Sequence, residues 1–176
     1  MSDMSLKTKA SLVSEAVFAE TYGGIYEHSP WVAEGAWAAR VGENIDTVTG
    51  LHGAMKATMA SADDGKKMQL ICAHPDLAGK LAVAGELTAA SKSEQAGAGL
   101  DHCTTAEFEE FQTLNTAYKN KFGFPFIVAV KGHNRHSILS AFRARLTNTP
   151  AIERKTALQE INRIAHFRLM ELVGNS

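Results

Sequence analysis

The chain contains only two cysteines in 176 residues, and this shortage excludes a disulfide framework. The two are Cys72 and Cys103. Because Cys72 lies in the apolar run 70–73, we expect it to be a buried free thiol. No spacing of cysteines and histidines is typical of a zinc site, so we expect no bound metal.

The chain also lacks blocks of one charge and long apolar runs. Its 18 basic residues balance 19 acidic ones, which argues against a general binder of nucleic acid or membrane surfaces. No apolar run approaches the length of a membrane span. Residues 1–7 lack the apolar core of a signal peptide, and residues 174–176 are not a peroxisomal address. We therefore expect a cytoplasmic protein.

Helical periodicity dominates what is present, and it predicts an all-α fold. The expected helices span residues 11–22, 30–41, 45–59, 63–72, 104–123, 136–146 and 151–173, and one more helix is expected to begin between Ser91 and Glu94. In the first of these helices, Leu12, Ala16 and Ala19 share one face. Residues 124–130 look like a strand, but no second β-branched run could pair with them. We expect a buried extended segment there. The prediction is one multi-helix bundle over residues 1–176, with an ordered core from about 10 to 173.

The first candidate for chemistry is His74, which precedes Pro75. Proline disfavours helical geometry at the residue before it, so His74 should lie just beyond the helix 63–72. An imidazole at such a helix end titrates near neutrality and is suited to acid–base work. The spacing alone slightly favours a structural role, in which His74 caps the carbonyls of that helix.

The second candidate is Glu94. Ser91 and Glu94 have the spacing of a capping box, in which Glu94 would only bind a backbone amide. Alternatively, the carboxylate would lie at a helix N-terminus beside the side-chain amide of Gln95. Together they would offer an acceptor and a donor to a planar, amide-rich ligand. The pattern favours the capping role.

The third candidate is Arg168, which falls inside the apolar stripe of the last predicted helix. That stripe consists of Ala157, Ile161, Ile164, Ala165 and Leu172. A guanidinium that faces a core requires an anion, because an unpaired buried charge is costly. The anion could be an internal carboxylate or the carboxylate of a substrate.

These residues belong to a longer pattern of motifs. The motifs are 24–33 (GIYEHSPWVA), 73–80 (AHPDLAGK), Ser91, 94–95, 98–100, 114–115, Tyr118, 121–130 (KFGFPFIVAV), 160–161, 164–165 and 168–169. Over most of its length the chain resembles the 2-oxo-4-hydroxy-4-carboxy-5-ureidoimidazoline (OHCU) decarboxylases of urate degradation. The HPDLAG and FGFPF blocks together make the resemblance specific.

The resemblance implies an all-α, cofactor-free carboxy-lyase that forms a homodimer and converts OHCU to (S)-allantoin. It implies that His74 is the essential catalytic group, with Glu94 beside it in the site. It also implies that the substrate contacts Arg168 and a set of pocket residues: Pro75, Ser91, Gln95, Phe126, Ile127, Val128, Ala129 and Val130. Lys131 departs from the arginine that we expect more often in the family, which affects only a peripheral contact.

Two other classes of protein share parts of this pattern. A non-catalytic helical module could keep the pocket and bind ureides or purine-breakdown intermediates without turnover. The joint presence of His74, Glu94 and Arg168 argues against it. A helix-mediated interaction protein would explain the apolar stripes but not the arginine among them.

Overall fold

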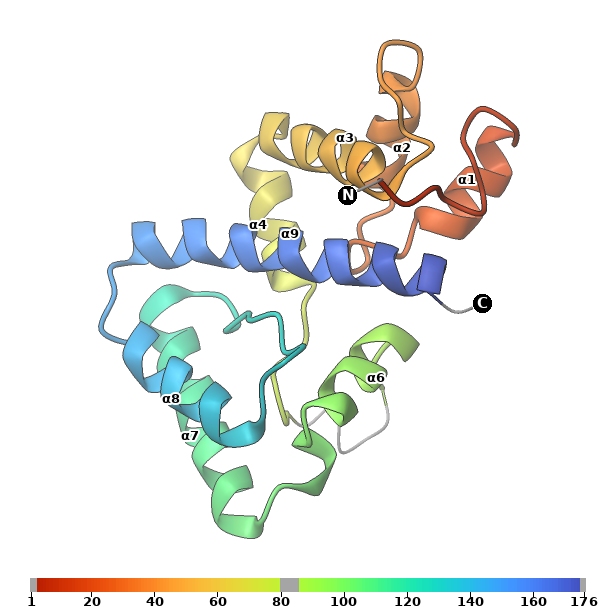
Figure 1. The fold of residues 1–176 in the computed structure, drawn as a ribbon. Helices are drawn as coiled ribbons and strands as arrows, with labels where there is room; N and C mark the ends of the chain where they lie inside the picture. Colours follow the sequence, from red (N-terminus) through yellow and green to blue (C-terminus); the bar gives the residue numbers. More distant parts are fainter. Residues whose placement is uncertain (1–2, 80–85, 175–176) are drawn as a thin grey trace. The chain divides into compact units, whose positions relative to one another are not determined.

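The computed structural model describes residues 3–79 and 86–174, and the described part is helical (Figure 1). The helices are α1 (Glu15–Tyr22), α2 (Trp31–Ala39), α3 (Val48–Ser61), α4 (Asp64–Cys72), α6 (Ala89–Gly97), the 3-10 helix η1 (Leu100–His102), α7 (Thr105–Phe122), α8 (Arg135–Arg145) and α9 (Pro150–Gly174). Within those residues the only β pairing is an isolated bridge between Ser5 and Thr47. The predicted all-α class is confirmed.

The chain divides into two compact units, which are described separately. The first unit comprises residues 1–73 and 162–176, and the second comprises residues 74–161. Helix α9 contributes its first half to the second unit and its second half to the first unit. The predicted site residues are therefore distributed over both units, with Arg168 in the first and all the others in the second.

The first unit is built on α1, α2, α3, α4 and the end of α9. Phe18 of α1 packs on Trp37 of α2, with 5.0 Å between their ring centroids. Ile45, just before α3, and Val48, Met55 and Met59 within it are all buried. The side chain of Asp63 accepts a hydrogen bond from the amide of Lys66 and begins α4 as expected.

Two predictions for the first unit are wrong. Helix α1 begins at Glu15, where Ser14 caps it, rather than near residue 11. Leu12 is 78% exposed, and Phe18 and Tyr22 form the buried face. Cys72 is an exposed free thiol, because Leu70 and Ile71 occupy the buried face at the end of α4.

The second unit is built on α6, α7, α8 and the start of α9. A capping box begins α7 at the predicted Thr104, with hydrogen bonds in both directions between Thr104 and Glu107. Gly123 ends this helix with φ +79°, a left-handed conformation that favours glycine. Figure 1 shows α7 and α8 lying alongside each other. Phe126 and Phe142 stack at 3.9 Å in the core of this unit.

Residues 124–130 follow α7 as a buried segment with neither helical nor strand pairing, as predicted. Side chains of neighbouring helices bind its backbone in place of a sheet. Arg145 of α8 donates to the carbonyl of Ile127 over 2.6 Å, and Glu160 of α9 accepts from the amide of Ala129 over 2.7 Å. The segment is therefore fixed without a partner strand.

Candidate active site

His74 opens the second unit, two residues beyond the end of α4, in a bend rather than a helix. This position confirms the prediction drawn from Pro75. The His74 side chain is buried, with 8% of its surface exposed. Pro75 and Asp76 are half-buried, and Leu77 and Ala78 are buried behind them. The imidazole is therefore shielded from most solvent.

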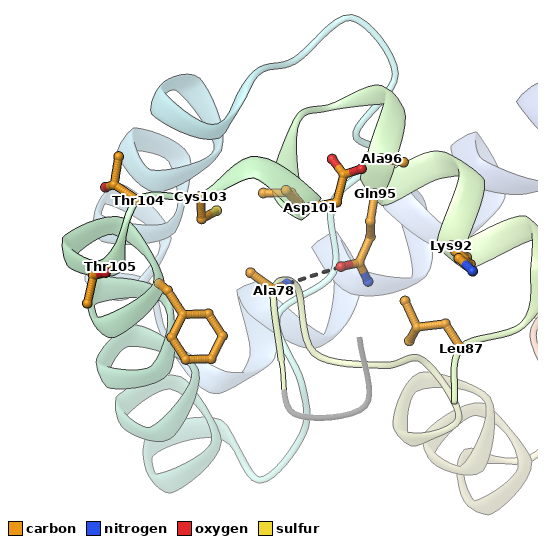
Figure 2. A pocket seen from close by; sticks show the side chains of 11 residues that line it. Ala78, Leu87, Lys92, Gln95, Ala96, Asp101, Cys103, Thr104 and Thr105 are labelled. Atoms are coloured by element: carbon orange, nitrogen blue, oxygen red, sulfur yellow. Dashed lines mark hydrogen bonds between the residues drawn. The ribbon is translucent and has the colours of Figure 1, made fainter. Parts of the chain in front are cut away.

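The loop after His74 has an unusual backbone. Ala78 has φ +48°, a left-handed conformation that is uncommon for a residue with a Cβ atom. The amide of Ala78 donates to the Gln95 side-chain oxygen over 3.1 Å (Figure 2). The Gln95 side-chain nitrogen donates to the carbonyl of Asp76 over 3.3 Å. Gln95 thus binds the loop with both ends of its amide.

Helix α6 carries the other polar residues predicted for the site, and it begins earlier than expected. Its cap is Thr88, whose hydroxyl accepts from the amide of Ser91. Ser91 therefore lies in the first turn and is buried, while Glu94 lies in the second turn and is half-buried. The proposed Ser91–Glu94 capping box is wrong, and so is the placement of Glu94 at the helix N-terminus. Glu94 lies within the helix, and Thr88 caps the helix instead of Ser91.

A pocket of about 500 Å³ lies beside Gln95 in the second unit. Helix α6, the loop around Ala78 and the start of α7 supply its walls (Figure 2). The lining residues are Ala78, Leu87, Lys92, Gln95, Ala96, Leu100, Asp101, Cys103, Thr104, Thr105 and Phe108. Of the predicted site residues only Gln95 lines this pocket. It is largely apolar with a few polar groups, which is the usual character of a small-molecule site.

The segment Phe126–Val130 was predicted to offer backbone groups to a substrate, and part of that backbone is already used internally. Arg145 and Glu160 occupy the carbonyl of Ile127 and the amide of Ala129, and His133 donates to the carbonyl of Val130 over 2.9 Å. Among the described residues, none hydrogen-bonds to the backbone amide or carbonyl of Val128. The same holds for the backbone of Phe126, and both residues are buried, so the backbones of Phe126 and Val128 are the parts of this segment best suited to a ligand contact.

Arg168 is buried in the first unit, as its place in the apolar stripe predicted. Ala157, Ile161, Ile164 and Ala165 are buried too, but Leu172 is 40% exposed and lies outside the stripe. An Arg168 nitrogen lies 2.9 Å from a carboxylate oxygen of Glu27, which is itself only 2% exposed. The guanidinium also donates to the carbonyl of Ile25 over 3.3 Å. The internal carboxylate considered in the sequence analysis therefore exists, and it is Glu27.

Several residues of these environments were missed by sequence reasoning. They are Glu27, Gln112, Asn115, Arg145 and Glu153. Glu153 is fully buried and receives hydrogen bonds from Arg145, Asn148 and Tyr118. Burial by itself would raise the pKa of Glu153, but these hydrogen bonds outweigh it and lower the pKa. Asn115 and Glu153 lie inside helical apolar stripes, which is the signal that revealed Arg168, whereas Glu27 lies in a loop and gives no such signal.

In residues 3–79 and 86–174, no group of three or more His, Cys, Asp or Glu side chains is arranged to hold a metal ion. Likewise, no helix within those ranges has the length and apolar character needed to cross a membrane.

The family model of OHCU decarboxylase matches residues 11–170. The chain belongs to the OHCU decarboxylase family. A 2-oxo-4-hydroxy-4-carboxy-5-ureidoimidazoline decarboxylase of Haloferax volcanii is 43% identical over 154 residues, which cover 88% of each chain. Family membership makes this protein a decarboxylase, a carbon–carbon lyase.

Two longer proteins are also similar. The uric acid degradation bifunctional protein PucL of Bacillus subtilis is 40% identical to this OHCU decarboxylase-family chain over 154 residues. The match covers 88% of the present chain and 30% of PucL. A crystal structure of (S)-allantoin synthase superposes with a TM-score of 0.71 at 33% identity. The chain covers 54% of that structure, about half its length, and 94% of the present chain is matched.

Proposed function

We propose that this protein decarboxylates OHCU to (S)-allantoin in urate degradation without a cofactor. The observation that carries the proposal is the 43% identity to a decarboxylase of that name across 88% of both chains. The buried His74 and the half-buried Glu94 are compatible with acid–base roles in this reaction.

The substrate itself makes the chemistry possible. In OHCU one ring carbon carries the carboxylate and a hydroxyl, and the next ring atom is a carbon doubly bonded to nitrogen. When the bond to the carboxylate breaks, carbon dioxide leaves and the electron pair moves toward that double bond, where the nitrogen takes up a proton. The hydroxyl then loses its proton to become a carbonyl, and the adjacent carbon gains one. The protein must orient the carboxylate, move these protons and exclude water.

Each residue then has a definite task. His74 moves the hydroxyl proton, and Glu94 fixes the imidazole or the ring amides. Arg168 holds an oxygen of the substrate while Glu27 balances its charge, so a neutral carbonyl oxygen suits it better than a full carboxylate. Pro75, Ser91, Gln95 and the backbone of 126–130 contact the substrate; of these, Gln95 also lines the pocket beside α6. Delivery of the final proton to one face of the carbon sets the handedness of the product.

The proposal extends to assembly and location. The protein works in the cytoplasm, as expected from its sequence, and as a homodimer, as the resemblance implied. Sedimentation velocity on the purified chain tests the dimer: a single species near twice the 19.0 kDa chain mass is expected. A single species at the chain mass would refute it.

The activity is tested by the handedness of the product. Urate oxidase and hydroxyisourate hydrolase supply fresh OHCU, and circular dichroism follows the allantoin that forms. We expect a rapid signal of one hand with the protein and a slow, racemic product without it. A racemic product at the control rate would contradict the proposal.

The same preparation distinguishes an enzyme from a binding module. A ligand that binds only the folded state raises its stability by mass action. Thermal protection by allantoin without stereoselective turnover would favour the module.

A further inference from the structure

The loop that follows His74 is held by side-chain amides rather than by secondary structure. Asn115 of α7 donates to the carbonyl of Leu77 over 2.9 Å, and Gln112 donates to the carbonyl of Ala78 over 2.7 Å. Gln95 of α6 binds the amide of Ala78 and the carbonyl of Asp76. Three side chains from two helices therefore make four hydrogen bonds to three consecutive residues.

We propose that this amide clamp, made of Gln95, Gln112 and Asn115, positions His74 for catalysis. The inference rests on the proposed function, because it takes His74 as the catalytic group. It goes beyond that function by assigning the task of holding His74 to three residues of α6 and α7. Gln95, predicted as a substrate contact, acts here through the backbone that it binds.

Backbone strain at Ala78 is the first reason to assign this task. A left-handed conformation costs an alanine about 1–2 kcal/mol, so it persists only where the surroundings enforce it. The clamp enforces it directly, because Gln95 binds the amide of Ala78 and Gln112 binds its carbonyl. Both sides of the strained residue are held.

Burial is the second reason. Asn115 is 3% exposed and Gln95 is 6% exposed, so each amide has given up most of its water. Such polar groups in a core contribute little net stability compared with well-packed apolar side chains. What a satisfied polar network provides is one defined geometry.

The connection to His74 is short and stiff. Only Pro75 separates His74 from Asp76, and the proline ring fixes one of the intervening backbone torsions near −65°. A shift of the Asp76–Ala78 backbone therefore moves the imidazole almost directly. A misplacement of about 1 Å in a catalytic group can cost about a hundredfold in rate.

The central test is Gln112→Met, which keeps the length of the side chain and removes the donor. We expect kcat for OHCU decarboxylation to fall about tenfold or more, with KM within about twofold of the native value. Gln112→Lys, which restores a donor, should recover most of the loss. Gln159→Met makes the same chemical change at an exposed position of α9 and should leave kcat unchanged.

A second readout does not depend on activity. The amide of Ala78 is bound to Gln95 and buried, so it should exchange slowly with solvent deuterium. In Gln112→Met this exchange should accelerate about tenfold, while the amides of α7 stay protected.

The outcomes separate the two proposals. Native kcat and native exchange at Ala78 in Gln112→Met would overturn the clamp. A loss of kcat fully explained by a lower folded fraction would also overturn it, since the role would then be stability alone. Racemic product from the native protein would instead refute the proposed function, and with it any catalytic task for the clamp, even where exchange at Ala78 responds.

Discussion

At the scale of single residues, Arg168 shows what a sequence can and cannot reveal. Its position in an apolar stripe predicted burial and the need for an anion, and both are present. The identity of that anion was not predictable, because Glu27 lies in the loop between α1 and α2, far from α9 in sequence. Periodicity reports which face of a helix is buried, but not which distant side chain meets that face.

The Glu27–Arg168 pair yields the first prediction. Glu27→Gln should lower the free energy of unfolding by about 3–5 kcal/mol, because it leaves a buried guanidinium without its counter-charge. Urea denaturation measures the change. Glu34→Gln, at an exposed position of α2, should change it by less than about 0.5 kcal/mol. Equal effects in the two variants would show that the pair contributes nothing specific.

The second prediction concerns His52 and pH. Burial lowers the pKa of His52; electrostatic interactions with His166 and Lys56 lower it further, although a hydrogen bond to the carbonyl of Asn162 opposes them. The two imidazole centroids lie 5.1 Å apart. Because the folded state binds the proton less readily than the unfolded state, the contribution of His52 is complete above pH 6.5 and is lost as pH falls below it.

Unfolding free energies measured between pH 5 and about 7.5 test this sign. The native protein should lose stability as pH falls, and His52→Gln should flatten that slope. His102→Gln serves as the control, because the His102 side chain is 80% exposed. A slope that His52→Gln leaves unchanged would exclude His52 as its source.

At the scale of elements, the sequence predicted helices well where local chemistry ends them. Asp63 and Thr104 begin helices through their own side chains, and Gly123 ends one through its backbone freedom. The sequence predicted a helix boundary at all three residues. Ser91 and Glu94 satisfied the same local rule, but Thr88 caps the helix instead. Both arrangements are locally sound, and tertiary packing that buries Ser91 decides between them.

The capping box of α7 carries the third prediction. Thr104→Ala removes the hydroxyl that accepts from the amide of Glu107 and should cost about 1 kcal/mol of stability. Thr105→Ala, one residue later inside the helix, should cost almost nothing, because alanine is the best helix former. Thermal unfolding of both variants compares them. A larger loss in Thr105→Ala would show that the helix does not depend on this cap.

The candidate site was also predictable only where local sequence patterns indicate it. Motifs identified His74, Glu94 and Arg168, and the local rule for proline placed His74 beyond its helix. Gln95 was predicted as a substrate contact, but the clamp was not predictable, because Gln112 and Asn115 bind a backbone more than 30 residues away, at separations of 34 and 38. A polar residue inside a helical stripe, such as Asn115, indicates burial but not which distant carbonyl the side chain binds.

At the scale of the whole molecule, the fold follows from apolar faces that repeat at helical spacing. The family resemblance depends on two short blocks, HPDLAG and FGFPF, which form no regular structure apart from Phe122, the last residue of α7. Both blocks lie in the second unit, where Asn115 of α7 binds the backbone of the first block and Arg145 of α8 binds the carbonyl of Ile127, just after the second. Catalysis in this account depends on irregular segments that a helical frame fixes.

The most direct measurement is the initial rate of (S)-allantoin formation by His74→Asn, compared with His136→Asn at a histidine whose side chain is 72% exposed. Circular dichroism of the product follows the reaction with enzymatically supplied OHCU, and far-ultraviolet spectra confirm that both variants fold. The account predicts loss of the single-handed product in His74→Asn, with a slow racemic background, and a native rate in His136→Asn. Native, stereoselective turnover by a folded His74→Asn would contradict it.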